Sequence, residues 1–156
     1  MKIGIQTCPW EPEKNRQQLP SVLAEIASAG YDGVEIGAQH LDISQPESFR
    51  QLVTSHGLQP VAIHVGGEIY NPQAVQEALG NLERTVLFAA KVGAMFLAFS
   101  GKAKDSKSIE ELQIEVDSLS RVWTCNRYSP SSARASFRGW WWNRMKRSVP
   151  PSKART

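Results

Sequence analysis

The two side chains best suited to proton transfer are a carboxylate and an imidazole, and each stands between two branched apolar residues. Glu35 interrupts one such run and His64 another. A carboxylate in a buried strand is costly unless it is paired or bound to a ligand. Neutral imidazole can bind a metal or exchange hydrogen bonds with a substrate hydroxyl near neutral pH. We predict catalytic roles for Glu35 and His64, the alternative for each being a purely structural partner inside the fold.

Three further residues are candidates for contacting a substrate. Gln6 and Ser100 are polar residues near the ends of predicted strands, and Trp10 follows the first strand closely. An indole could form an apolar wall for a sugar ring, although Trp10 could equally plug a loop. Glycines at 66 and 67, just beyond His64, would let a ligand approach the backbone.

These residues fall in a chain pattern that occurs four times: a short apolar run, a polar loop, an amphipathic helix and a glycine. The pattern predicts strands at 2–8, 32–37, 59–65 and 95–100. A loop rich in Pro and Glu follows the first strand. The predicted helices carry apolar stripes with helical spacing, which are Leu19, Val22, Leu23, Ile26 and Ala27; Phe49, Leu52 and Val53; Val75, Ala78, Leu79, Leu82, Val86, Ala89 and Ala90; and Ile109, Leu112, Val116 and Leu119.

Helix boundaries are marked by capping signals. Gly30, Gly57 and Gly93 are expected to end the first three helices. Pro46 suits the first turn of the second helix, and Asn71-Pro72 is expected to cap the third. Ser108 with Glu111 forms a capping box for the fourth.

The alternation of residues within the strands predicts which face carries a site. One set is branched or bulky and suits packing against helices: Ile3, Ile5, Val34, Ile36, Val61, Ile63, Val65, Leu97 and Phe99. The opposite set is small or polar: Gly4, Gln6, Glu35, Ala62, His64, Ala98 and Ser100. Its polar members lie towards the carboxyl ends of the strands, where parallel barrels build their sites.

Strands that alternate with helices predict an α/β fold with a parallel sheet. Four units of roughly 30 residues match the first four of the eight units of a TIM barrel, which usually needs about 250 residues. An open Rossmann-type sheet alternates in the same way, but Gln6-Thr7-Cys8-Pro9-Trp10 replaces the Gly-rich fingerprint after the first strand. We therefore favour the partial barrel.

A sharp change of composition divides the chain at Val122. Residues 1–122 hold 10 Lys/Arg and 15 Asp/Glu, whereas residues 123–156 hold 8 Lys/Arg, no acidic residue and four of the five Trp. We interpret 1–122 as the partial barrel and 123–156 as a non-homologous basic tail. A reading-frame error after Val122 explains the change most simply, and a genuine disordered basic tail is the alternative.

Three segments, in order and at the expected intervals, resemble the xylose-isomerase-like barrel superfamily. They are Gly4-Ile5-Gln6-Thr7, the phrase from Ala29 to Ile36, and Pro60 to Val65. The superfamily includes sugar phosphate isomerases/epimerases, hydroxypyruvate isomerases, inosose dehydratases and the endonuclease IV group. The resemblance covers residues 1 to about 122, the amino-terminal half of the barrel.

This resemblance implies a sugar (phosphate) isomerase or epimerase in which a divalent metal (Mn, Mg, Zn or Co) holds a hydroxy-carbonyl substrate while carboxylates move a proton beside the carbonyl. The superfamily's metal ligands come from strands five to eight, which this sequence does not show. His64 matches a third-strand histidine that contacts substrate or metal, and Glu35 matches a second-strand carboxylate. We therefore expect no metal ligand in this chain, and no activity from it alone.

The charge distribution and the unpaired strand edge bear on which other partners are expected. Endonuclease IV-like cleavage of DNA is an alternative, disfavoured by the acidic 1–122 segment, and a nucleic-acid-binding tail is another. An open fourth strand would permit a homodimer. The chain has no signal-like or membrane-spanning apolar run, so we expect a cytoplasmic protein with a carbohydrate substrate and no membrane partner.

Overall fold

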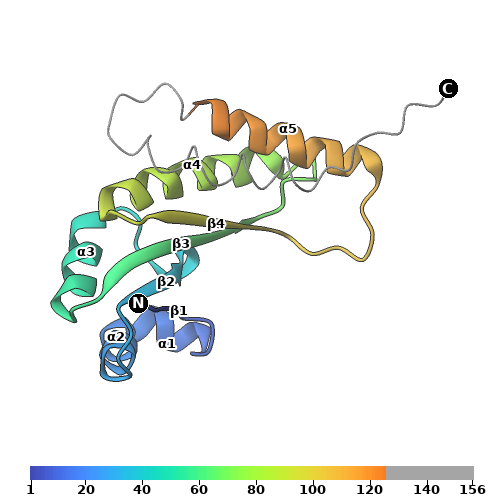
Figure 1. Cartoon of the computed structure of the whole chain (residues 1–156). Helices are drawn as coiled ribbons and strands as arrows, with labels where there is room; N and C mark the ends of the chain where they lie inside the picture. Colours follow the sequence, from blue (N-terminus) through green and yellow to red (C-terminus); the bar gives the residue numbers. More distant parts are fainter. Residues whose placement is uncertain (126–156) are drawn as a thin grey trace.

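The computed structural model describes residues 1–125, which form one four-stranded parallel sheet flanked by helices (Figure 1). The strand order is β1-β2-β3-β4, so each strand lies beside its neighbour in the sequence. Every connection from one strand to the next contains at least one helix. These are the first four β/α units of a TIM barrel, and the predicted fold class is confirmed.

The strands differ in length from those predicted. They are β1 (Gly4–Gln6), β2 (Gly33–Gly37), β3 (Gln59–Gly67) and β4 (Phe96–Gly101). In the pairing register, Gln6 lies opposite Glu35, and His64 lies opposite both Gly37 and Ala98. The predicted functional residues therefore stand on adjacent strands towards one end of the sheet.

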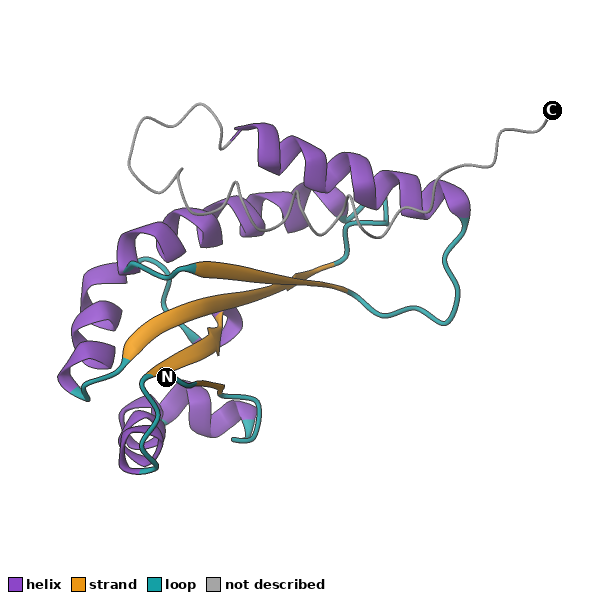
Figure 2. Cartoon of the chain, viewed as in Figure 1, coloured by secondary structure: helices purple, strands orange, loops and turns teal. Residues whose placement is uncertain are grey.

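Six helical segments connect or follow these strands: α1 (Pro12–Gln17), α2 (Leu19–Ser28), the 3-10 turn η1 (Ala38–His40), α3 (Pro46–Ser55), α4 (Val75–Val92) and α5 (Ile109–Cys125). Figure 2 shows them against the strands. The segment predicted as a Pro- and Glu-rich loop contains α1, so that prediction is wrong. Pro12 suits the first helical turn, and the buried Asn15 side chain donates to the carbonyls of Thr7 and Trp10.

The three glycines that were predicted to end helices do so. Gly30, Gly57 and Gly93 have φ angles of 83°, 73° and 79°. A side chain would be strained in this left-handed region, which is why helices so commonly end on glycine.

Two of the three predicted helix starts are confirmed. Pro46 lies in the first turn of α3. The Ser108 hydroxyl accepts from the amide of Glu111, whose carboxylate accepts in return from the amide of Ser108. The prediction for α4 is wrong in detail: α4 begins at Val75 with Ala74 as its N-cap. The Asn71 side chain instead accepts from the amide of Gln73 in the preceding turn.

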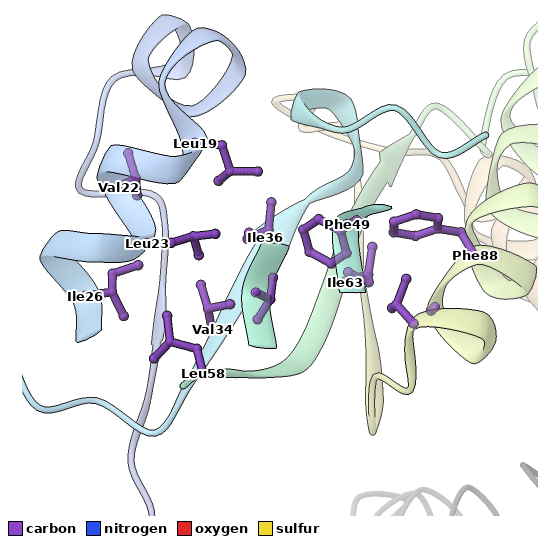
Figure 3. Close-up of a cluster of buried hydrophobic side chains, with 13 residues drawn as sticks. Leu19, Val22, Leu23, Ile26, Val34, Ile36, Phe49, Leu58, Ile63 and Phe88 are labelled. Atoms are coloured by element: carbon purple, nitrogen blue, oxygen red, sulfur yellow. The ribbon is translucent and has the colours of Figure 1, made fainter. Parts of the chain in front are cut away.

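The main core lies between the sheet and the helices α2, α3 and α4. In Figure 3 the side chains of α2 face Val34 and Ile36, and Phe49, Ile63 and Phe88 gather beyond them. The rings of Phe49 and Phe88 lie 5.5 Å apart in a tilted arrangement. Val34, Ile36 and Ile63 are buried in the cluster formed with these helices, so the predicted helix-facing direction of these three residues is confirmed.

A β-bulge reverses the predicted direction of Val61. The register pairs Val34 with Pro60 and the next residue, Glu35, with Ala62, which leaves Val61 as an extra residue in β3. Its Cγ2 lies only 2.4 Å from where a Cβ on Gly33 would stand, so Val61 faces the same side as Gly33 and Glu35. We predicted that Val61 packs against the helices, and this prediction is wrong because the bulge shifts the alternation by one residue.

Apolar residues at the two ends of the sheet are less covered than predicted. Ile3, expected against the helices, is exposed beside β1. The α5 stripe is exposed too: Ile109 by 81%, Leu112 by 47%, Val116 by 58% and Leu119 by 37%. Instead, α5 lies alongside α4 (Figure 1) and packs through Ile114 and Val122. This stripe is exposed because, within residues 1–125, no further β/α unit lies beside β4 to cover it.

The compositional boundary at Val122 falls inside α5, whose backbone continues to Cys125. The division into 1–122 and 123–156 stays a prediction. The basic, Trp-rich segment from residue 126 onward, with the hypotheses of a frameshift or of nucleic-acid binding, lies outside the described residues.

Candidate functional site

The candidate site is the inner face of the sheet, opposite the helices, at the carboxyl ends of the strands. In a parallel sheet successive side chains point to opposite faces, and the helix-facing residues of β2 and β3 identify the other face as the inner one. Gln6 ends β1, Glu35 lies in β2, His64 in β3 and Ser100 near the end of β4. Four of the five predicted site residues therefore share this face.

Gln6 and Glu35 form the first polar pair. They lie opposite each other in the β1–β2 register, and the Gln6 side-chain amide donates to Glu35 Oε1 at 2.8 Å. Glu35 is half-buried. The Gln6 amide supplies the hydrogen bond that a carboxylate inside a strand needs. Glu35 Oε2 has no partner among residues 1–125 and is available to accept a hydrogen bond from a ligand hydroxyl.

His64 and Ser100 form the second polar pair. His64 Nε2 and Ser100 Oγ lie 2.8 Å apart, in a hydrogen bond whose donor is set by the imidazole tautomer. The contact joins β3 to β4, and it fixes the direction of a half-buried imidazole. With Nε2 engaged, Nδ1 is the ring nitrogen that has no partner within the described residues.

The two pairs are close enough to contact the same small molecule. Glu35 pairs with Ala62, two residues before His64 on the adjacent strand. From the spacing of strands and the rise per residue, the Cα atoms of Glu35 and His64 are about 8 Å apart. Beyond His64, a Cβ on Gly66 would meet only the Ser100 carbonyl, at 3.5 Å, so the backbone is open there. A sugar-sized ligand could span both pairs.

Trp10 is not directed towards these pairs. Its indole packs against the main core, and its Nε1 donates to Glu25 of α2 at 2.7 Å. Glu25 also accepts from Lys14, at 2.7 Å. The hydrogen bonds from Lys14 and then from Trp10 hold the pKa of Glu25 below its ordinary value. This placement fits the loop-plug alternative, and a substrate contact by Trp10 stays a prediction.

A third polar pair at the same edge was missed from the sequence. Glu68 follows β3 and Lys102 follows β4, and their charged groups lie 2.6 Å apart. Hydrogen bonds to Glu68 from Lys102 and then from Asn71 lower its pKa, while the bond to Glu68 raises the pKa of Lys102. The signal was available, because both residues come directly after strands that end at the same edge.

The described part of the chain does not fit a metal ion. Within residues 1–125, no three His, Cys, Asp or Glu side chains are grouped so that they could hold one. Glu35 and His64 are each hydrogen-bonded to a neutral polar side chain instead. No step through a metal is derived for these residues.

Solved structures similar to this fold are sugar epimerases and isomerases. An L-ribulose 3-epimerase is similar with a TM-score of 0.60 and 23% identity, over 78% of this chain and 45% of its own length. A 3-keto-D-glucoside 4-epimerase from E. coli gives 0.59 and 22%, over 80% and 52%. A sugar phosphate isomerase/epimerase from Parabacteroides distasonis gives 0.61 and 16%, over 81% and 47%.

These likenesses establish the fold alone: the described units are arranged as the amino-terminal half of a TIM barrel. The chain spans about half the length of the solved structures that it matches. No protein-family model matches the sequence, and no curated protein does either. None of the helices within residues 1–125 has the length and apolar character needed to cross a membrane.

Proposed function

We propose that this chain is a fragment of a sugar (phosphate) isomerase or epimerase and that its inner face binds the carbohydrate. The observation that carries the proposal is the arrangement of two hydrogen-bonded polar pairs, Gln6–Glu35 and His64–Ser100, at the carboxyl edge of a barrel-type sheet. Sugar hydroxyls need both donors and acceptors, and these pairs offer a carboxylate oxygen, an imidazole nitrogen and a hydroxyl within one ligand's reach. The names of the similar structures point to the same substrate class.

Each residue has a role within this proposal. Gln6 holds Glu35 Oε1, so that Oε2 is directed to a substrate hydroxyl or to a proton beside a carbonyl. Ser100 orients the His64 ring, whose remaining nitrogen meets the substrate. The proposed parent enzyme would depend on a divalent metal to polarise the carbonyl. Because the described residues do not fit a metal, we propose that the chain binds sugar without turning it over. The cytoplasmic setting stays a prediction.

Calorimetric titration of the full chain with ketoses tests the binding. D-allulose, the ligand held by a similar D-allulose 3-epimerase, is the first probe, with L-ribulose and D-fructose beside it. His64→Ala and Glu35→Gln should each weaken binding by about tenfold, since each removes a hydrogen bond that involves a polar or charged group. His56→Ala and Glu47→Gln are matched controls: His56 lies beyond the opposite end of β3, and Glu47 pairs with Arg50 on α3. Equal weakening by the controls, or no binding by the unchanged chain, would contradict the proposal.

Proton exchange tests the absence of turnover. Proton transfer beside a carbonyl in D₂O replaces a carbon-bound hydrogen of the ketose with deuterium, which NMR detects. We expect no replacement above the uncatalysed rate, with or without added Mn²⁺. Replacement that is abolished by Glu35→Gln would show that the chain is itself catalytic.

A further inference from the structure

The sheet has two open edges that are parallel to each other. Among residues 1–125, β1 pairs only with β2, and β4 pairs only with β3. The amide of Met95 donates to the carbonyl of Val61 on β3. Because alternate amides of a parallel strand point to opposite sides, the amide of Ala98 is directed away from β3. Six residues of β4 thus offer a partly unpaired edge to another strand.

Apolar side chains accompany both open edges. On the β4 side, α5 exposes Leu112, Val116 and Leu119, one continuous helical stripe. On the β1 side, Ile3 is exposed. In a barrel, the helix that follows one strand packs over that strand and the next one. The stripe on α5 is therefore suited to cover a strand that is added beside β4, together with the helix-facing residues of that strand.

The inner face is also uncovered near the amino end of β4. Phe96 pairs with Ala62 and shares a face with Ala98 and Ser100, and it is 52% exposed. In a closed eight-stranded barrel this space is filled by side chains from the strands opposite. Within residues 1–125 no opposite strands cover this face, which leaves the Phe96 side chain half-exposed.

We propose that two copies of this chain close one eight-stranded barrel, with β4 of each copy pairing with β1 of the other. A two-fold axis along the barrel keeps all strands parallel, because rotation about that axis does not reverse their direction. Four described strands per copy give eight, and the similar solved structures are about twice as long as the part of them that this chain covers. The proposal goes beyond carbohydrate binding and does not depend on it.

A second copy satisfies both edges at once. The strand that it adds beside β4 is its own β1. Parallel units in both copies have right-handed crossovers, so the helices of both copies lie on the outside of the closed barrel. Ile3 and Ile5 of that β1 then come beneath the α5 stripe. A two-fold dimer of this kind is closed, so it has no remaining strand edge at which to grow.

Sedimentation velocity of the full chain over a range of concentrations is the test. We expect a species of twice the 17.3 kDa chain mass. Ala98→Pro removes the outward amide of β4, and Leu112→Lys with Val116→Lys places charges in the stripe. Each change should raise the dimer dissociation constant by about tenfold or more. Leu87→Lys is the matched control, since Leu87 is an exposed apolar residue on α4, and it should leave the dimer unchanged. Circular dichroism checks that all the variants are folded.

Three results would overturn the proposal. A monomer at all concentrations would do so, and hydrogen exchange would then distinguish an open edge from one covered by another segment of the same chain. A dimer that the lysine pair and Ala98→Pro leave intact would be held by another surface. Aggregates that grow with concentration would show that the edges associate without closing a barrel.

Discussion

The β2–β3 side of the described chain and its β4–α5 side are made from the same kind of unit, yet they bury their apolar residues very differently. On the first side, the branched residues of the strands are almost fully enclosed by α2, α3 and α4. On the second side, α5 packs on α4 through a few residues and leaves its apolar stripe outside. The helices on both sides are amphipathic.

The difference shows that a β/α unit does not complete its own core. Ile63 is buried in a cluster that includes Phe49 of α3, from the preceding unit, and Phe88 of α4, from its own unit. Val116 has the right spacing and the right chemistry, but no described element lies over it. Burial in this fold is therefore a property of neighbouring pairs of units, and α5, the helix of the last described unit, exposes its stripe.

Truncating one apolar residue on each side, Ile63 and Val116, gives the largest contrast. Ile63→Ala should reduce the free energy of unfolding by about 2–5 kcal/mol, because the residue is fully buried and its cavity cannot collapse completely. Val116→Ala should change it by at most about 0.5 kcal/mol in protein dilute enough to be monomeric. Urea unfolding followed by circular dichroism measures both values. Similar losses from the two substitutions would contradict the described burial.

Replacing Gly33 by alanine tests the bulge that turns Val61 towards the inner face. Gly33→Ala should cost about 1–3 kcal/mol, because its Cβ would lie 2.4 Å from Val61 Cγ2 and 2.9 Å from the Gln59 carbonyl. Gly4→Ala is the matched control on the adjacent strand, where the nearest atom is 3.4 Å away. The same unfolding experiment measures both. If Gly33→Ala is no worse than Gly4→Ala, Val61 does not face inward.

Removing the α5 cap should have a smaller and local effect. Ser108→Ala deletes the hydroxyl that accepts from the Glu111 amide, and it should lower the stability of α5 by about 1 kcal/mol. Hydrogen exchange should show faster exchange in α5 and unchanged exchange in β2 and β3. Ser106→Ala, two residues earlier and outside the capping box, is the control. Faster exchange on both sides would mean that α5 and the main core unfold together.

The smallest expected effect is a pH dependence confined to the start of α5. Hydrogen bonds from Lys104 and then from the Ser108 backbone lower the pKa of Glu111 from its ordinary 4.5. The fold therefore favours the charged carboxylate, and this stabilisation is present above pH 4.5 and disappears as the pH falls through the lowered value. Glu111→Gln keeps the capping box but loses the charge. Exchange in α5 should differ between variant and parent near neutral pH and converge in acid, whereas a constant difference would contradict the ion pair.

Much of the fold could be predicted because it depends on local patterns. Gly30, Gly57 and Gly93 end helices for a steric reason that acts within a few residues, and the four strand–helix units follow from hydrophobic spacing. Val61 could not be predicted in the same way. Its direction depends on a bulge, and the bulge is visible only in the register between β2 and β3.

The candidate site, too, could be predicted only in part. Glu35 and His64 were identified because a polar residue inside an apolar strand needs a partner, but the partners themselves, Gln6 and Ser100, are 29 and 36 residues away in sequence. Only the alternation of all four strands placed them on one face. Trp10 was harder, because a loop aromatic has no periodicity to show whether it faces the core or a ligand.

The central claim is that the inner face at the carboxyl edge of the sheet is the ligand-binding face. It is tested most directly by recording ¹⁵N-resolved NMR spectra of the full chain during titration with D-allulose. Our account predicts saturable shifts of the amides around Gln6, Glu35, His64 and Ser100, with α3 and the outer face of α4 unaffected. Shifts confined to the helices, or none at millimolar ligand, would contradict it.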